Sequence, residues 1–145
     1  MTRGCPFCSQ AEIKERTIAK NKYVFAFPTN IPIVPGHVLV APVRHVARFS
    51  DATANERKAL FAMIAKLQKT PEKAFRAKGF NIAWNQGAAA GQTVFHFHVH
   101  LLPRRKGDAG VTKYEPRKFL YRPRSREESP QDELKAVADT IRRAL

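Results

Sequence analysis

Apolar and polar residues alternate over several short stretches of this chain, as expected for β-strands with one buried face. β-Branched and aromatic residues dominate the first two stretches, and Pro35-Gly36 predicts a turn just before the second. Gly79 precedes the third stretch, and a Gly-rich turn at 87–91 precedes the fourth. The pattern therefore predicts strands over residues 17–28, 37–44, 80–84 and 93–102.

Two other segments repeat their apolar residues with the period of a helix. Thr53 and Glu56 form a Thr-x-x-Glu capping box ahead of the first helix. Its predicted apolar stripe, packed against the core, is formed by Leu60, Ile64 and Leu67 together with Phe61 and Met63 beside them. Ser129 as the cap and Pro130 in the first turn predict a last helix that ends near Leu145. This order of elements predicts an α+β domain with an antiparallel sheet.

Three histidines, His96, His98 and His100, occupy alternate positions of the last predicted strand. Side chains alternate between the two faces of a strand, so the three histidines share one face. The opposite face receives the apolar residues Phe95, Phe97, Val99 and Leu101. Neighbouring histidines on such a face sit roughly 7 Å apart, close enough to converge on one small anion or metal. A purely solvated face would more readily use Lys, Thr or Glu, whereas a metal-binding strand is a stronger alternative because imidazole is the commonest metal ligand.

The turn before this strand carries groups that suit a phosphate. Glycines at 87 and 91 let backbone amides approach a phosphate closely, and Gln92 and Thr93 add side chains that donate hydrogen bonds. A neutral histidine, whose ordinary pKa is about 6.5, is a nucleophile near pH 7. Nucleophile and donors together are what displacement at phosphorus requires, and this step needs no metal.

The length of 145 residues predicts a single domain over 1–145. No apolar run approaches the roughly 20 residues of a membrane-spanning helix, and the first residues lack the apolar stretch of a secretory signal. We therefore expect a cytoplasmic protein that does not use a membrane.

The chain is strongly basic: 26 Lys and Arg against 12 Asp and Glu give a formal charge of +14, which favours an anionic partner or substrate. Half of this charge is local, because nine basic and two acidic residues between Arg104 and Arg126 give a net +7. Tyr114, Phe119 and Tyr121 lie among them. This basic C-terminal extension, from about residue 104, is either a solvated tail or a rim that attracts phosphates or nucleic acid.

Cys5 and Cys8 are the two cysteines of the chain and form a Cys-x-x-Cys pair. In a reducing compartment such a pair binds metal or does redox work more often than it forms a structural disulfide. The spacing lets two thiolates bind one tetrahedral Zn²⁺, which needs two further ligands. The alternative is a frayed N-terminus with two unoccupied thiols.

Together these motifs resemble the histidine triad (HIT) superfamily, whose signature is His-x-His-x-His-x-x with x hydrophobic. The signature stands here at residues 96–102, and the likeness includes Pro35-Gly36-His37, residues 90–94 and residues 102–104, so that it spans roughly 5–104. The resemblance implies a HIT-like fold, in which an antiparallel sheet of about five strands packs with a long helix and a C-terminal helix. It also implies a homodimer formed through the region that includes the helix.

The same resemblance implies a nucleotide hydrolase or transferase in which His98 attacks the α-phosphorus and forms a nucleotidyl-histidine intermediate. His96 and His100 would flank the site, with His100 contacting the phosphate and assisting the leaving group. His37 would buttress the triad.

Further substrate contacts are implied by position in the family pattern. Asn85, Gln92 and Thr93 resemble the polar residues that contact the phosphates and the leaving atom. The position that commonly holds a ribose-binding Asp or Asn holds Thr29 here, and Asn30 beside it could compensate.

A zinc-containing subset of the superfamily resembles this chain at the cysteine pair as well. In that subset the remaining ligands are one histidine after the Pro-Gly-His strand and one from the triad, which correspond to His45 and His96. Such a zinc would be structural, because four protein ligands leave no open position for substrate.

The expected reaction is cleavage of the α-phosphate linkage of a dinucleoside polyphosphate or a nucleoside phosphoramidate. Residues 103–108 resemble the dinucleoside-polyphosphate branch, in which Arg104, Arg105 and Lys106 could meet the far phosphates. Two alternatives stay open. One is a nucleotidyltransferase or phosphorylase of the same superfamily, and the other is a zinc-stabilised nucleic-acid-binding module, suggested by the charge and by the aromatic residues after Arg104.

Overall fold

The computed structural model describes residues 4–108 and 128–145. In chain order the elements are α1 (Pro6–Ser9), α2 (Ala11–Glu15), β1 (Ala19–Lys20), β2 (Val24–Pro28), β3 (Val38–Pro42), the 3₁₀ turn η1 (Phe49–Asp51), α3 (Ala54–Gln68), α4 (Pro71–Ala74), β4 (Gly79–Ala83), the 3₁₀ turn η2 (Ala88–Ala90), β5 (Val99–Arg104) and α6 (Gln131–Ala144). Within these ranges no helix is long and apolar enough to cross a membrane. Most of the predicted basic extension, residues 109–127, lies outside the described residues.

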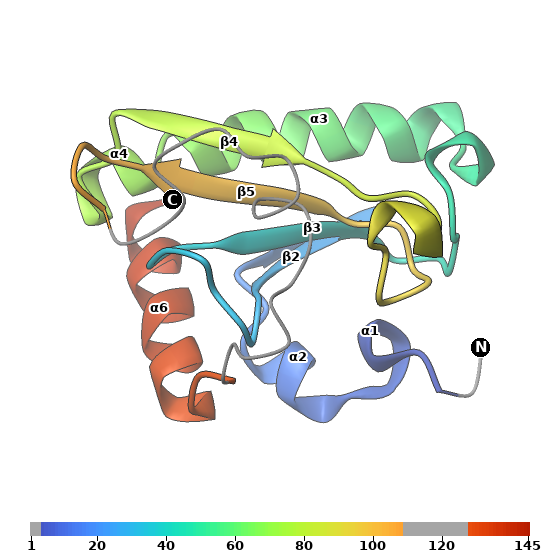
Figure 1. Ribbon diagram of the computed structural model, residues 1–145, viewed down its shortest axis with the longest axis horizontal. Helices are drawn as coiled ribbons and strands as arrows, with labels where there is room; N and C mark the ends of the chain where they lie inside the picture. The colour runs from blue at the N-terminus through green and yellow to red at the C-terminus, as the bar shows by residue number, and fades with distance from the viewer. Residues whose placement is uncertain (1–3, 109–127) are drawn as a thin grey trace.

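The strands form one five-stranded sheet in the order β1-β2-β3-β5-β4, and every neighbouring pair is antiparallel. Figure 1 shows α3 running alongside the strands and α6 at the end of the sheet where β3 begins. β5 lies between β3 and β4, with His100 opposite Leu39 on one side and Ala83 on the other. The predicted α+β class with an antiparallel sheet is confirmed.

The two faces of the sheet are covered differently. One face carries the main core, to which the strands contribute Val24, Ala26, Val38, Val40, Val99 and Leu101, and the helices Leu60, Ile64, Ala138 and Ile141. The other face carries a smaller cluster of Phe25, Phe27, Leu39 and Ala41, covered by Ile13 and Phe7 from the N-terminal segment. Because side chains alternate along each strand, successive residues of a strand pack into different clusters, one on each face of the sheet.

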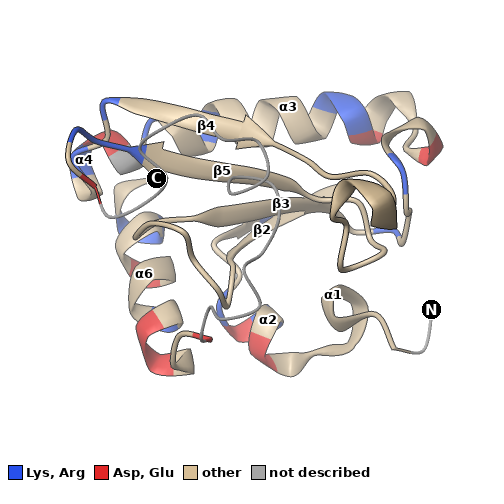
Figure 2. Ribbon diagram, in the orientation of Figure 1, with Lys and Arg blue, Asp and Glu red and all other residues tan. Residues whose placement is uncertain are grey.

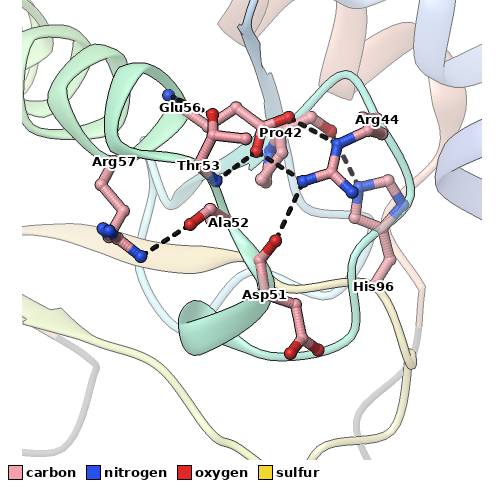
Figure 3. Close-up of polar contacts among 8 residues, drawn as sticks. All are labelled: Pro42, Arg44, Asp51, Ala52, Thr53, Glu56, Arg57 and His96. Carbon is pink, nitrogen blue, oxygen red and sulfur yellow. Dashed lines mark hydrogen bonds and ion pairs between the residues drawn. The ribbon is translucent and has the colours of Figure 1, made fainter.

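Helix α3 begins as the sequence predicts. Thr53 and Glu56 form a reciprocal capping box, and the Arg44 guanidinium donates to both carboxylate oxygens of Glu56 (Figure 3). These donors hold the pKa of Glu56 below its ordinary value, Arg44 being the largest cause. The expectation for one residue of this helix is wrong: Phe61 is 56% exposed, because it lies beside the buried stripe of Leu60, Met63, Ile64 and Leu67.

The buried Arg16 ties the N-terminal segment to the C-terminal helix. Its guanidinium donates to the carbonyl of Pro28 and to the side chain of Gln131, and Gln131 in turn donates to the carbonyl of Glu12. Burial lowers the pKa of Arg16, although the side chain remains a cation at neutral pH. Figure 2 shows acidic residues on α2 and in the first turn of α6, in contrast to the basic residues at the end of β5.

Three of the boundaries that differ from the predictions have a visible cause in the structure. The predicted strand over 17–28 is a hairpin of β1 and β2, because the side chain of Asn21 accepts from the backbone N–H groups of Tyr23 and Val24 and makes a turn. Helix α6 is capped by Pro130 without a side-chain bond, so the prediction of Ser129 as its cap is wrong. Ser129 instead donates its backbone N–H to the carbonyl of Asn30 at 2.7 Å. The third boundary, at residues 93–98, lies in the site itself.

Candidate active site and metal cluster

The predicted histidine strand is shorter than expected, because β5 begins only at Val99. Before that residue the backbone leaves the sheet, and Phe97 donates its N–H to the carbonyl of Val46 at 2.6 Å. Phe97, Val99 and Leu101 still enter the main core, as predicted. Phe95 does not: it is 55% exposed, so its assignment to the buried face is wrong.

His98 is held in one tautomer by the backbone. Its Nδ1 lies 2.7 Å from the carbonyl oxygen of His96. A carbonyl only accepts, so Nδ1 is protonated and donates, and in the neutral ring the lone pair is on Nε2. The side chain is 7% exposed, as expected for a residue that lines a site and does not face bulk solvent.

His100 is held in the complementary tautomer by His37. The backbone N–H of Ile33 donates to Nδ1 of His37, so the proton of the neutral His37 ring is on Nε2. This Nε2 lies 3.0 Å from Nδ1 of His100 and donates to it. His100 therefore carries its own proton on Nε2. The His98 and His100 rings are 5.0 Å apart between centroids, closer than the 7 Å spacing expected from an ideal strand.

Phe7 is the site residue that sequence reasoning did not assign. Its ring centroid lies 5.1 Å from that of His98, edge to face at 83°, and 5.6 Å from that of His96. It also meets Phe27 at 5.1 Å. The only sequence signal was its position between the two cysteines, which marks a tight turn but does not tell which way the side chain points.

The four predicted metal ligands come together from three parts of the chain. Ligand atoms of Cys5, Cys8, His45 and His96 all lie within 4.8 Å of one another. Nδ1 of His96 is 3.5 Å from the sulfur of Cys5 and 3.6 Å from that of Cys8, and Nδ1 of His45 is 3.6 Å from the sulfur of Cys8. A tetrahedral zinc with bonds of about 2.3 Å to sulfur and 2.0–2.1 Å to nitrogen places these atoms roughly 3.6 Å apart. The residues therefore fit a zinc ion.

His96 is prepared as a ligand by its surroundings. Its Nε2 donates to the carbonyl of Pro42 at 2.8 Å, a contact drawn in Figure 3, and this leaves the lone pair on Nδ1, toward the thiols. Burial lowers the pKa of His96 to about 4, so the ring is neutral at physiological pH. His96 thus directs its lone pair toward the cluster.

The Gly-rich turn adopts the backbone that glycine permits. Gly87 and Gly91 both have φ of +88° and flank η2. The amide of Gln92 is buried: it accepts from the N–H of Gly87 and donates to the carbonyls of Ala47 and Val94. Asn85 donates to the carbonyl of Gly91, and Thr93 is exposed. These predicted substrate contacts therefore cluster at one turn, and Gln92 shapes it.

The two predicted ribose contacts lie on the loop after β2. Thr29 is buried, and its hydroxyl is 3.4 Å from the N–H of Ile31, whereas Asn30 is half-buried. Thr29 and His37 line the same cavity of about 220 Å³ against α6. This loop brings the predicted ribose position next to the His37–His100 pair.

At the far end of β5, Arg104 is engaged within the protein. Its guanidinium donates to both carboxylate oxygens of Asp108 and to the side chain of Asn81. Arg105 and Lys106, which follow it in the chain, are both exposed. They lie at the same end of the sheet, where Figure 2 shows basic residues. Arg104, one of the three predicted phosphate contacts, is therefore engaged in holding the turn that follows β5.

A family model described as the HIT domain matches residues 10–107, which is more than half of the chain. The chain belongs to the HIT family. The HIT signature at residues 96–102 contains the two tautomerically fixed histidines, and the expected HIT-like fold is confirmed by its solved members. One of these is a Zn-bound histidine triad family protein from Mycobacterium smegmatis, with a TM-score of 0.73 and 27% identity over 97% of this chain and 92% of that one.

Two HIT relatives have names that state an activity. An asymmetrical bis(5'-nucleosyl)-tetraphosphatase of Schizosaccharomyces pombe is 42% identical over 102 residues, which are 70% of this chain and 56% of that protein. A bis(5'-adenosyl)-triphosphatase of Saccharomyces cerevisiae is 36% identical over 101 residues, 69% of this chain and 49% of that protein. This chain thus matches about half the length of these two HIT proteins.

Proposed function

We propose that this HIT protein hydrolyses dinucleoside polyphosphates and that His98 attacks the α-phosphorus to form a nucleotidyl-histidine intermediate. The observation that carries the proposal is the bond from Nδ1 of His98 to the carbonyl of His96. It assigns the proton to Nδ1 and the lone pair to Nε2, so the ring is a nucleophile without first losing a proton.

The first step forms a bond from Nε2 of His98 to the α-phosphorus and breaks the bond from that phosphorus to the bridging oxygen. The bridging oxygen leaves with the electron pair, and the imidazole gains one positive charge because Nδ1 keeps its proton. His100 has its N–H at Nε2, which supports a role in donating to the leaving oxygen. Water then attacks the phosphorus, the bond from phosphorus to Nε2 breaks with its electron pair returning to Nε2, and the proton that the water loses is released to solvent.

The substrate class rests on the named relatives and on the charge of the chain. A tetraphosphatase and a triphosphatase share the HIT region with this protein, and a net charge of +14 favours a polyanionic substrate. In this proposal Asn30 and Thr29 contact the ribose, Asn85, Thr93 and the turn amides contact the phosphates, and Gln92 holds the turn in place.

We further propose a structural Zn²⁺ held by Cys5, Cys8, His45 and His96. The sulfur–nitrogen distances near 3.6 Å and the lone pair of His96 on Nδ1 support it. The ion would crosslink α1 to the loops after β3 and before β5. With four protein ligands, it would leave the reaction to the histidines.

A homodimer is the proposed assembly. β4 is the last strand of the sheet, and Ile82, Trp84 and Phe61 form an exposed apolar surface on and beside it, with exposed fractions of 44%, 40% and 56%. Exposed aromatic residues next to a strand edge are typical of a protein interface.

The decisive experiment is a product analysis in water enriched in ¹⁸O. The protein and its His98→Ala variant are incubated with diadenosine tetraphosphate, diadenosine triphosphate and adenosine phosphoramidate, and the products are identified by mass. We expect the wild type to release AMP and ATP from the tetraphosphate, with ¹⁸O in the AMP, and the variant to release neither.

Other product patterns identify the alternatives. Two molecules of ADP would contradict attack at the α-phosphorus. ADP formed from the tetraphosphate only after inorganic phosphate is added would indicate a phosphorylase. No turnover by folded, zinc-loaded protein, combined with salt-sensitive binding to polynucleotides that survives His98→Ala, would replace the enzyme by a nucleic-acid-binding module.

A further inference from the structure

The first helical turn of the chain holds an aromatic ring against the proposed nucleophile. Helix α1 has four residues, and its backbone bonds from Cys8 and Ser9 return to Cys5 within the same turn. A helix this short is not stable by itself, because too few bonds offset the ordering of its backbone. Its position therefore depends on what its side chains contact.

Those contacts point in two directions from adjacent residues. The thiols of Cys5 and Cys8 face the imidazoles of His45 and His96. Phe7, between the thiols, turns its ring to the sheet and meets Phe27, His96 and His98. The contacts of the cysteines thus set the position of this helical turn relative to the sheet. The position of this turn then sets where the Phe7 ring meets His98.

The orientation of the His98 ring depends on a packing contact of this kind. The bond from Nδ1 to the carbonyl of His96 holds one atom of the ring, and the packing of neighbouring rings limits how far the imidazole turns about that bond. Phe7 lies against the ring at 5.1 Å and His100 at 5.0 Å, so both neighbours limit that rotation. In-line attack is sensitive to this angle, because a displacement of 1 Å at a reacting atom costs on the order of 100-fold in rate.

We propose that Phe7 is a positioning residue for His98 and that the Cys5–Cys8–His45–His96 cluster, when it holds its metal, acts on the reaction through Phe7. This inference rests on the proposed function. It assigns the metal cluster a second effect beyond holding the N-terminus: a filled cluster keeps the nucleophile aimed.

The first test compares Phe7→Leu with Phe25→Leu, both as zinc-loaded protein. Phe25 belongs to the same apolar cluster, stacks on Phe27 at 5.2 Å and meets His96 at 6.5 Å, so its loss removes one ring from the cluster and from His96, as the loss of Phe7 does. We expect Phe7→Leu to lower kcat roughly 10-fold or more, with KM changed less than 3-fold and one zinc retained per chain. Phe25→Leu should keep kcat within about 2-fold, and Phe7→Tyr should restore most of the loss.

The second test asks whether the metal acts through this ring. Zinc is removed from wild type and from Phe7→Leu with a chelator, and the single-turnover rate is measured for all four states. We expect removal to slow the wild type and to have little further effect on Phe7→Leu, because effects that share one route are not additive. His45→Ala, with three ligands left, repeats the comparison if chelation unfolds the protein.

A third readout requires no turnover. In NMR spectra without substrate, the ring protons of His98 should shift alike on Phe7→Leu and on zinc removal, since both displace the same aromatic ring.

Three results would overturn the proposal while the wild type still turns over substrate. One is a raised KM with unchanged kcat in Phe7→Leu, which would make Phe7 a substrate contact. The others are full additivity with zinc removal and His98 signals that ignore the metal. Failure of the proposed function is distinct, since the wild type itself would then release no AMP.

Discussion

Nε2 of His37 donates to Nδ1 of His100 over 3.0 Å, and the backbone N–H of Ile33 occupies the other nitrogen of His37. A peptide bond outside the triad thereby decides which nitrogen of His100 carries the proton. We expect His37→Leu to lower kcat by about 10-fold or more, while loss of His100 itself costs about 10²–10³-fold, typical of losing a donor to an oxygen that develops negative charge.

The tautomer of His100 is measurable in the same variant. Nitrogen-15 shifts should report a proton on Nε2 of His100 in the wild type and a mixture of tautomers in His37→Leu. The same mixture of tautomers in both proteins would contradict control of the His100 tautomer by His37.

Zinc binding predicts a sharp effect on stability. We expect one zinc per chain, and chelation should lower Tm by 10 °C or more, roughly 2 kcal/mol or above for a domain of this size, because the ion binds only the folded arrangement of Cys5, Cys8, His45 and His96. His45→Ala should lower zinc affinity and shift Tm in the same direction. A Tm that ignores both chelator and added zinc would rule the site out.

Glu56 predicts a specific dependence of stability on pH. Arg44 and the N–H of Thr53 lower its pKa in the folded protein, so its carboxylate stabilises the fold above the unfolded pKa of about 4.3, and this stability is lost as pH falls through and below that value. Glu56→Gln should be less stable than wild type at pH 7, and the difference should shrink below about pH 4.3. Glu72→Gln, at an exposed glutamate, serves as the control in urea unfolding.

The proposed dimer places Phe61 at its interface. Phe61→Lys should convert the protein to a monomer in light scattering, because a charge there would be buried without a partner. Leu145→Lys changes an exposed apolar residue elsewhere and should leave the mass unchanged. A monomeric wild type would refute the assembly directly.

Gly36 is predicted to tolerate no side chain. Its φ is +85°, and an added Cβ would lie 2.9 Å from the Phe75 ring and 3.0 Å from Pro103. Gly36→Ala should therefore destabilise the protein by about 2–4 kcal/mol in urea unfolding, and displace His37 next to it. Gly79→Ala, where a Cβ meets open space, is the matched control.

The sequence predicted those features that depend on local pattern. The capping box at Thr53 and the division of His98 and Phe97 between two faces follow from spacing along the chain, whereas the two histidines of the four-residue metal cluster were expected from the resemblance to zinc-containing HIT proteins. Tertiary contacts decided the rest. Phe97 bonds to Val46 and so leaves the sheet, and Ser129 bonds to Asn30 and so does not cap α6.

Side-chain direction within a turn was beyond the sequence as well. Gln92 has the donors of a phosphate contact, yet its amide bonds to three backbone groups. Phe7 has no polar atom to suggest chemistry, and only its packing against His98 draws attention to it.

The metal cluster joins segments that are synthesised far apart in time. Cys5 and His96 are 91 residues apart, so a growing chain carries its cysteine pair through β1 to β4 before the last ligand exists. A local zinc finger nucleates folding, whereas here the loop must close over a long contour, which delays formation. If the cluster binds metal as proposed, capture waits until residue 96 has been made, and in a shorter nascent chain the cysteine pair lacks the His96 ligand.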